Sequence, residues 1–480
     1  MSIVNLTSTR VGASQNRNML TGVDVQTSKI LTGDSNYLDH IFDDSIDVTV
    51  GVFFDGTLNN RYNAQAGVES KRKQAGENYN AKVLDHFIAD SDESTSFYND
   101  ESNISRLEPY YKETNEEKHK TYKIYIDGIG TEAYDEDSTV GFALGQGPTG
   151  IKGKVEIGCK EVAKKITKAV SSTQLKKVNT LTIDSYGFSR GAAAARHFIS
   201  ELYKTKGEIK AIYGSGMSTV IIYYDADGGI LGEELQKKGI TVKRLVVRFV
   251  GLYDTVTSLG LPWFHKMNDK SLHLNAIRKA RKVVHLTAGD EHRSNFVLTN
   301  IKSASNGKEI ELPGVHSDIG GGYVDGASEK VKLNTSHFYL PPLRKERLEL
   351  IEQGWYKPDE IRVDNMWGTL WGERASISNK YSYIPLQMMC KFSVETGNIP
   401  YKKTQLENAY YVGSSDILTL AKLTLFSYAF NNGSTIPENE ALIKSLRNKF
   451  FHFSAHYNGA LDSMSPSFKN GKREREVFDG

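Results

Sequence analysis

Five short apolar runs, each ending in a polar or glycine-rich turn, divide the first two thirds of the chain. The segments between several of them carry helical periodicity, most clearly after residue 150 and after residue 190. Strands that alternate with helices are typical of an α/β fold with a mostly parallel central sheet, which is the predicted fold class. The predicted strands are Asp47–Phe54, Tyr122–Asp127, Leu181–Gly187, Arg244–Gly251 and Val283–Ala288.

Polar segments set the limits of the predicted core. Residues 1–46 have little periodicity and predict a loosely ordered polar arm, whereas 47–334 hold all the predicted strands. Residues 61–115 are rich in Asn, Glu and Lys, which indicates an insertion with helical pieces. Three of the four tryptophans lie in 335–415, a segment without strand–helix alternation that we expect to be a mostly helical insertion or lobe. Residues 416–480 are expected to complete the main domain and to add a tail of mixed charge.

Composition narrows the class of protein. Hydrophobic residues make up 39% and charged residues 25% of the 480 residues, which is ordinary for a globular protein. The net charge of +2 gives no general argument for nucleic acid as a partner. Cys159 and Cys390 are too few for a disulfide framework or a cysteine-rich metal site. No run approaches the roughly 18 apolar residues of a membrane helix, and the first twenty residues lack the apolar stretch of a signal peptide. We therefore expect a chain that is soluble where it is made, in the cytoplasm.

The stretch Thr182–Arg196, TIDSYGFSRGAAAAR, carries the strongest chemical signal. It places Ser189 between a predicted strand and a predicted alanine-rich helix, with Gly187 and Gly191 on either side. In a nucleophile elbow such glycines allow close backbone approach, and the N–H group after the serine, here that of Arg190, faces the developing oxyanion. The alternative is an ordinary turn with an exposed serine. The strand before the motif and the helix after it favour the elbow, and with it an α/β-hydrolase-like fold.

A serine nucleophile needs a base and an acid that orients the base. In α/β-hydrolases the chain order is serine, acid, histidine. Asp254 follows the fourth predicted strand, and His316 lies in the glycine-rich stretch PGVHSDIGGGY, so both fit this order. Asp254 could instead be a turn residue or a helix cap, and His316 a hydrogen-bonded loop histidine. Other histidines also remain candidates: His197, His285, His292, His452 and His456. The last two are the strongest competitors, because they too follow Asp254 in the chain.

Four motifs occur in a fixed order: FFDGTLNN, SYGFSRGAAAARHF, GLYDTV and PGVHSDIGGGY. As a set they resemble the α/β-hydrolase domain of the bacterial type VI secretion lipase effectors, in the family that has a GxSxG elbow and acts as phospholipase A. The resemblance covers residues 47–325 and extends to FHFSAHYNG near residue 459. It implies that Ser189 is the nucleophile, Asp254 the acid and His316 the base. The implied fold has a mostly parallel central sheet flanked by helices, with helical insertions.

The resemblance further implies a function. The protein would be a carboxylic-ester hydrolase that cleaves acyl esters of glycerophospholipids and acts as an antibacterial effector. A type VI spike or tube protein would carry it into the periplasm of a target cell, where the phospholipid membrane is the substrate, and a cognate immunity protein would protect the producer. Because this chain shows no large C-terminal membrane-anchoring region, we expect the insertions 61–115 or 335–415 to meet the membrane. Two alternatives stay open: an esterase or thioesterase for small soluble acyl substrates, and a non-catalytic secreted binding module.

The loop after the first strand is the remaining candidate element of the site. Backbone N–H groups of Phe54, Asp55 and Gly56 are predicted to supply the second oxyanion donor beside Arg190, because this loop leaves the same sheet edge. Asp55 is expected to brace the loop rather than to bind a cation together with Asp318, since no dense carboxylate cluster surrounds it. We expect neither a cofactor nor a metal.

Overall fold

The computed structural model describes residues 45–89, 95–138, 147–171, 173, 176–213, 219–257, 269–336, 339–413, 415–431, 440–457 and 464–480. All but the last two residues of the predicted N-terminal arm lie outside these ranges. The described helices are α4 (Arg61–Gln74), α5 (Ala81–Leu84), α6 (Asn103–Leu107), α8 (Ile151–Val170), α9 (Arg190–Leu202), α10 (Gly229–Lys237), α11 (His316–Gly320), α12 (Pro341–Glu352), α13 (Tyr383–Gly397), α14 (Lys403–Ala409), α15 (Asp416–Phe430) and α16 (Glu440–Phe450).

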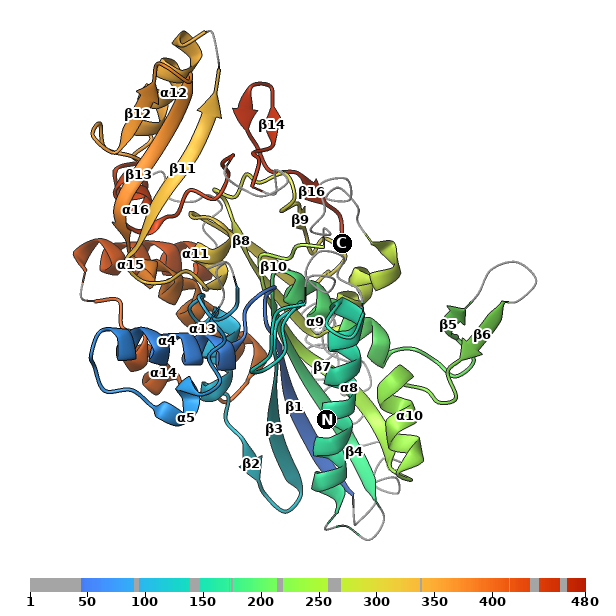
Figure 1. Ribbon diagram of the computed structural model, residues 1–480. Coiled ribbons are helices and arrows are strands. Elements are labelled where there is room, and N and C mark those ends of the chain that lie inside the picture. Colours follow the sequence, from blue (N-terminus) through green and yellow to red (C-terminus); the bar gives the residue numbers. More distant parts are fainter. Residues whose placement is uncertain are drawn as a thin grey trace, which may run out of the picture.

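A seven-stranded sheet in the order β10-β8-β7-β4-β1-β3-β2 forms the centre of the molecule (Figure 1). All neighbours pair in parallel except β2, which is antiparallel to β3. This confirms the predicted fold class; β10, whose residues alternate between polar and apolar, is a strand that the apolar runs did not predict. The strands are β1 (Ile46–Phe54), β2 (Thr114–Asn115), β3 (His119–Ile126), β4 (Lys177–Phe188), β7 (Thr241–Tyr253), β8 (Lys282–Ala288) and β10 (Gly307–Leu312).

Each face of the sheet has its own hydrophobic core. Successive residues of a strand point to opposite faces, so Phe53 joins one core and Phe54 the other. Helices α8, α9 and α10 cover the face that receives Phe54, and α6 and α13 cover the opposite face. Residues Ala192–Ala195 of α9 are fully buried, and their small side chains let this helix pack closely on β1 and β4. Burial on both faces explains why the central strands are almost continuously apolar.

One buried ion pair lies within the central strands. The Asp184 carboxylate on β4 is fully buried and accepts hydrogen bonds from Arg248 Nη2 at 2.6 Å and Nε at 3.0 Å. The hydroxyl of Tyr111 donates to the same carboxylate at 2.8 Å. Because a buried carboxylate needs such partners, this cluster links the segment after α6 to the two strands beside the elbow.

A smaller antiparallel sheet, in the order β11-β13-β12, projects from the main body together with α12 (Figure 1). Its strands are β11 (Ala327–Thr335), β12 (Ile361–Asp364) and β13 (Thr369–Ile377). The segment 335–415, predicted to be mostly helical, therefore contains two strands in addition to α12, α13 and α14. The connections after β11 and after β12 lie together, since Ser336 N–H donates to Gly368 O at 2.7 Å.

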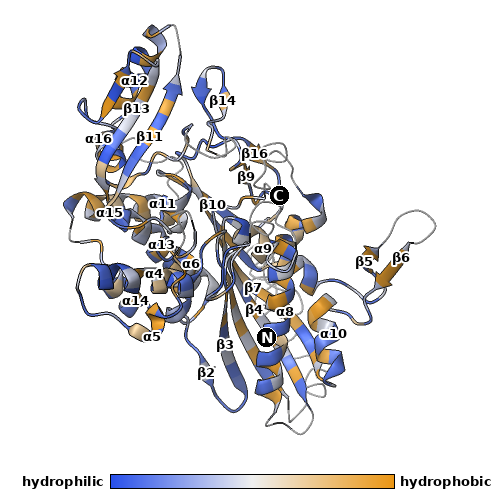
Figure 2. Ribbon diagram, in the orientation of Figure 1, coloured by the Kyte–Doolittle hydropathy of each residue, from blue (hydrophilic) through white to orange (hydrophobic). Residues whose placement is uncertain are grey.

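A hairpin of β5 (Ile209–Tyr213) and β6 (Val220–Tyr223) extends from the body near α10 (Figure 1). Figure 2 shows that its residues are mostly hydrophobic. The apolar side chains of this hairpin with the highest exposed fractions are Ile212 and Tyr213 on β5 and Val220 on β6. The last described segment contains β14 (Phe468–Lys469), β15 (Lys472–Arg473) and β16 (Val477–Phe478), and β16 pairs in parallel with β9 (Leu298–Thr299).

Candidate functional site

Ser189 lies between β4 and α9 in the geometry of a nucleophile elbow. Its φ of 58° and ψ of −128° are strained for a residue with a side chain. A Cβ atom at Gly187 would come within 2.3 Å of the Gly191 carbonyl oxygen, and one at Gly191 within 2.1 Å of the Asp55 carbonyl oxygen. Both flanking glycines are therefore required by backbone contacts. The turn is held to the neighbouring strand β7 by the Ser189 N–H group, which donates to Tyr253 O at 3.0 Å.

Asp254 and His316 are in direct contact, although 62 positions separate them in the sequence. Asp254 follows the last residue of β7, and His316 is the first residue of α11. The Nδ1 atom of His316 lies 2.5 Å from Oδ2 of Asp254. Burial alone would raise the pKa of Asp254, but the charge of Arg475 and the hydrogen bond from His316 lower it well below its usual range. The carboxylate is thus the acceptor and Nδ1–H the donor, which leaves Nε2 as the basic nitrogen of His316.

Two contacts connect the elbow with the segments that carry Asp254 and His316. The Phe188 ring lies 4.6 Å from the His316 ring, centroid to centroid, and Val256 N–H donates to Ser189 O at 3.3 Å. In the part of the chain that the structure describes, no hydrogen bond joins the Ser189 hydroxyl to another residue. Ser189 and His316 are only 5% and 4% exposed, so the pair and the elbow are shielded from water. Burial lowers the pKa of His316, against the opposing effect of Asp254, so the imidazole is neutral at neutral pH.

Three of the other candidate histidines bond elsewhere. His197 Nδ1 lies 2.8 Å from Leu272 O. His285 accepts from Thr255 N–H through Nε2 at 2.9 Å. His452 Nδ1 lies 2.9 Å from Asp318 Oδ1.

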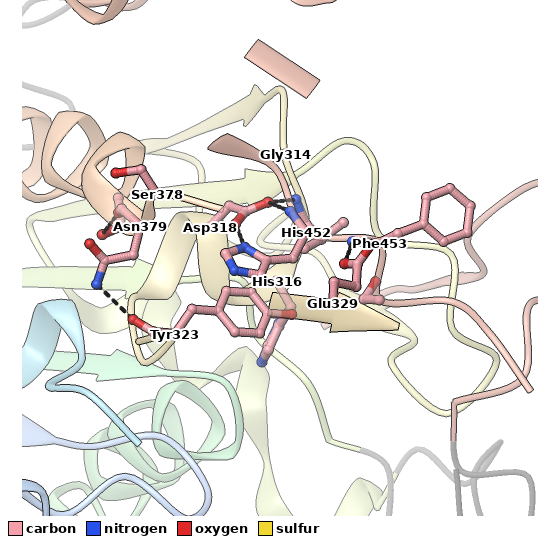
Figure 3. A network of polar contacts seen from close by, with 12 residues as sticks. Gly314, His316, Asp318, Tyr323, Glu329, Ser378, Asn379, His452 and Phe453 are labelled. Atoms are coloured by element: carbon pink, nitrogen blue, oxygen red, sulfur yellow. Dashed lines mark hydrogen bonds and ion pairs between the residues drawn. The ribbon is translucent and has the colours of Figure 1, made fainter. Parts of the chain in front are cut away.

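Asp318 and His452 form another acid–histidine contact, which Figure 3 shows together with His316. Tyr323 stacks on the His452 ring with centroids 3.7 Å apart. Asp318 also accepts from Val315 N–H at 3.0 Å, so this carboxylate fixes the turn that begins with His316. Burial raises the pKa of Asp318, and the hydrogen bond to His452 opposes this rise.

Arg475 is a site residue that the sequence did not reveal. Its Nη1 and Nη2 atoms lie 2.7 and 2.8 Å from Oδ1 and Oδ2 of Asp254, which makes a bidentate ion pair with the acid. The sequence showed only a tail of mixed charge, because nothing local connects residue 475 to residue 254. An aromatic side chain also contacts the pair: the Phe296 ring packs edge-on against the His316 ring, with the ring centroids 4.8 Å apart.

A second buried ion pair contacts the backbone of His316. Glu291 is fully buried and binds Arg293 through two hydrogen bonds of 2.9 and 2.8 Å. The same carboxylate accepts from His316 N–H at 3.3 Å. The sequence shows only that GDEHR follows a predicted strand. The hydrogen bond between Glu291 and His316 depends on the tertiary structure, so the sequence did not predict it.

Asp55 occupies the loop that was expected to supply the second oxyanion donor. Its N–H group donates to Ile126 O at 2.9 Å, and Gly56 N–H donates to Asp55 Oδ1 at 2.7 Å. The Asp55 carboxylate also accepts from Ser102 Oγ at 2.5 Å and from Tyr125 Oη at 2.6 Å. Two of the predicted donors are therefore already engaged, Asp55 N–H with strand β3 and Gly56 N–H within the loop.

The described residues contain no group of three or more His, Cys, Asp or Glu side chains arranged to hold a metal ion. Asp55 and Asp318, considered together as a possible cation site, are each bonded to different protein groups. Among the helices that the structure describes, none combines the length and apolarity needed to cross a membrane.

The mostly parallel sheet, the strained serine between strand and helix, and the buried acid–histidine pair that follows β7 and β10 define an α/β-hydrolase of the lipase and esterase type. The chain belongs to the Tle1-like phospholipase effectors of the type VI secretion system: the family described as "T6SS, Phospholipase effector Tle1-like, catalytic domain" matches residues 50–341. The resemblance predicted from the four motifs is thus confirmed, and the protein is a lipase effector of that secretion system.

A solved structure agrees with this fold. The Tle1 effector bound to the VgrG spike of the type VI secretion system superposes with a TM-score of 0.57 at 20% identity, over 91% of this chain and 94% of that chain. An uncharacterized protein from Pseudomonas aeruginosa matches with a TM-score of 0.44 at 16% identity, over 90% of this chain and 55% of that chain. Comparison with curated proteins gives no match.

Proposed function

We propose that the protein is a phospholipase A that hydrolyses acyl esters of glycerophospholipids through Ser189, His316 and Asp254. The observation that carries this proposal is the 2.5 Å contact between His316 Nδ1 and Asp254 Oδ2 next to a serine with φ of 58°. Family membership supports the lipid substrate. The conserved chemistry of serine esterases supports the assignment of roles.

In the proposed reaction the Ser189 oxygen attacks the acyl carbonyl carbon while Nε2 of His316 takes the serine proton. Asp254 holds the Nδ1–H tautomer and stabilises the imidazolium that forms. The tetrahedral intermediate expels the lysophospholipid oxygen, which receives the proton from His316. Water, deprotonated by the same imidazole, then cleaves the acyl-enzyme and releases the fatty acid. Each step balances without a cofactor.

The oxyanion would be held by backbone N–H groups. Arg190 begins α9, and the first turn of a helix presents N–H groups without intrahelical acceptors and a favourable dipole. For the second donor, Gly56 would exchange its bond to Asp55 Oδ1 for a bond to the oxyanion. This exchange is favoured because the developing oxyanion is the stronger acceptor.

Exposed apolar residues support contact with lipid. Met366 and Trp367 lie between β12 and β13 and are 82% and 68% exposed, and Tyr339, 63% exposed, belongs to the adjacent connection. These residues lie in 335–415, one of the two segments expected to meet the membrane. An aromatic and a methionine at one tip suit the boundary between water and lipid.

Delivery is proposed by analogy with the family. A spike protein would carry the effector, as the solved Tle1 effector is bound to the VgrG spike. The target would be phospholipid reached from the periplasm of a neighbouring cell, with an immunity protein protecting the producer.

The test compares wild-type protein with Ser189→Ala on mixed phospholipid vesicles and measures fatty-acid and lysophospholipid release. We expect release by the wild type and a loss of at least about a thousandfold in the variant. Cleavage of short soluble esters alone, dependent on Ser189, would favour the small-ester alternative. Absence of any turnover together with absence of fluorophosphonate labelling at Ser189 would favour a non-catalytic binding module.

Two histidine variants test the assignment of the base. His316→Gln removes the only histidine among the described residues that hydrogen-bonds Asp254, so labelling of Ser189 should fall by at least about a thousandfold. His452→Gln is the matched control, because His452 binds Asp318 instead. Equal losses in both variants would contradict the assignment.

A further inference from the structure

Residues 473–480 form a strap across the site. Arg473 donates to Ala455 O at 2.7 Å and pairs with Glu346 of α12 at 3.0 Å, which attaches the strap to the projecting lobe. Two residues later Arg475 reaches Asp254. Beyond it, β16 pairs with β9, and Asn300 Nδ2 donates to Asp479 Oδ1 at 2.7 Å. The strap therefore spans the lobe, the acid and the edge of the main body, and it lies outside the matched residues 50–341.

Asp254 uses its full hydrogen-bonding capacity. Its carboxylate accepts two bonds from Arg475, one from Ala288 N–H at 2.9 Å, and one from His316. A carboxylate has about four acceptor positions, so none remains for other donors. Arg475 is itself fixed, because its Nε donates to Phe296 O at 2.7 Å and its side chain is only 8% exposed.

We propose that Arg475 is a positioning residue of the hydrolase: from the strap 473–480 it clamps both oxygens of Asp254 and holds this acid ionised and oriented toward His316. The inference rests on the proposed function. A fully buried carboxylate without a cation would take up a proton or turn toward other donors, and the tautomer of His316 would no longer be fixed.

The charged groups that surround the Asp254–His316 pair decide the direction of the pH effect. The charge of Arg475 lowers the pKa of Asp254, so removal of Arg475 should let Asp254 take up a proton at higher pH. A protonated Asp254 no longer supports a proton on His316, and the acidic limb of the rate profile should therefore move to higher pH. The other charged groups near the pair remain in place in such a variant: Asp290, Glu291 and Arg293 after β8, Glu311 on β10, and Asp318 with His452.

The experiment measures the rate of fluorophosphonate labelling of Ser189 across pH in full-length Arg475→Gln and Arg473→Gln. The second variant is the control, since Arg473 is an arginine of the same strap whose side chain is 13% exposed and which bonds to Ala455 and Glu346 rather than to Asp254. For Arg475→Gln we expect a plateau rate about tenfold to a hundredfold lower and an acidic limb shifted upward by about one pH unit. For Arg473→Gln we expect lower thermal stability with both kinetic features unchanged.

Restoration of the cation separates positioning from simple structural support. Millimolar guanidinium ion should recover part of the labelling rate of Arg475→Ala, and Arg475→Lys should keep more activity than Arg475→Gln because it retains the charge. The inference would be overturned if Arg475→Gln were labelled at the wild-type plateau rate with the acidic limb at the wild-type pH. It would also be overturned if Arg475→Gln and Arg473→Gln changed the labelling rate equally. Failure of wild-type Ser189 to label would instead overturn the proposed function, so the two failures are distinguishable.

Discussion

The stability of the fold should depend on the ionisation of Asp55. This carboxyl group is 1% exposed, and burial raises its pKa from 3.8 to about 7. Hydrogen bonds from Ser102, Tyr125 and Gly56 act in the opposite direction but do not cancel the effect of burial. Near neutral pH the folded protein is therefore poised between a protonated and an ionised Asp55.

The magnitude follows from the difference between the two pKa values. In the unfolded chain Asp55 loses its proton near pH 4, whereas the folded protein retains it up to about pH 7. Between these values the folded state binds more protons, so the free energy of unfolding falls by about 1.4 kcal/mol per pH unit as pH rises. The loss is complete above pH 7 and amounts to about 4 kcal/mol.

Asp55→Asn isolates this effect, because the amide has nearly the same shape and no charge. Chemical unfolding of both proteins between about pH 4 and pH 9 should show their stability difference moving by about 4 kcal/mol in favour of the variant. Parallel curves at all pH values would refute the reasoning and would mean that the three hydrogen bonds cancel the effect of burial.

Three further substitutions test the packing beneath the site, each by the shift in chemical unfolding. Gly191→Ala should cost about 2–3 kcal/mol, because the new Cβ would meet the Asp55 carbonyl oxygen at 2.1 Å; a neutral result would show that the elbow can relax. Arg248→Met should cost about 3–5 kcal/mol by leaving Asp184 charged and buried. Tyr111→Phe removes one hydrogen bond to the same carboxylate and should cost less, about 1.5–3 kcal/mol. The reverse order of these two costs would contradict the role given to the ion pair.

The predictable part of the site consists of local signals. The stretch around Ser189 revealed a strand, a turn with two required glycines and a helix of small residues, because each of these depends on a few neighbouring side chains. Asp254 and His316 were placed by the expected chain order and by resemblance. Chain order alone did not decide between His316 and His452, because both follow Asp254 in the chain. In the structure both histidines have a carboxylate partner, and His316 is the one that contacts Asp254.

The unpredicted part consists of contacts between distant segments. Arg475 lies 221 positions from Asp254, and an arginine in a tail of mixed charge carries no local mark of such a contact. Strand β12 has only four residues, too few for a recognisable alternation, and it is stabilised by pairing with β13. The oxyanion role of the loop after β1 stays a prediction. The motif FDGT gave no sign that Gly56 N–H donates to Asp55 Oδ1.

Two acid–histidine pairs lie a few residues apart, and their surroundings give them opposite electrostatic character. Burial acts on both acids in the same direction. Asp254 is held ionised by Arg475 in addition to His316, so it can stabilise an imidazolium as His316 gains a proton. Burial prevails at Asp318, whose pKa is raised despite the bond from His452. A carboxyl group with a raised pKa suits a structural hydrogen bond better than repeated stabilisation of a cation. The arginine from the strap is thus the feature that separates the pair proposed for catalysis from its neighbour.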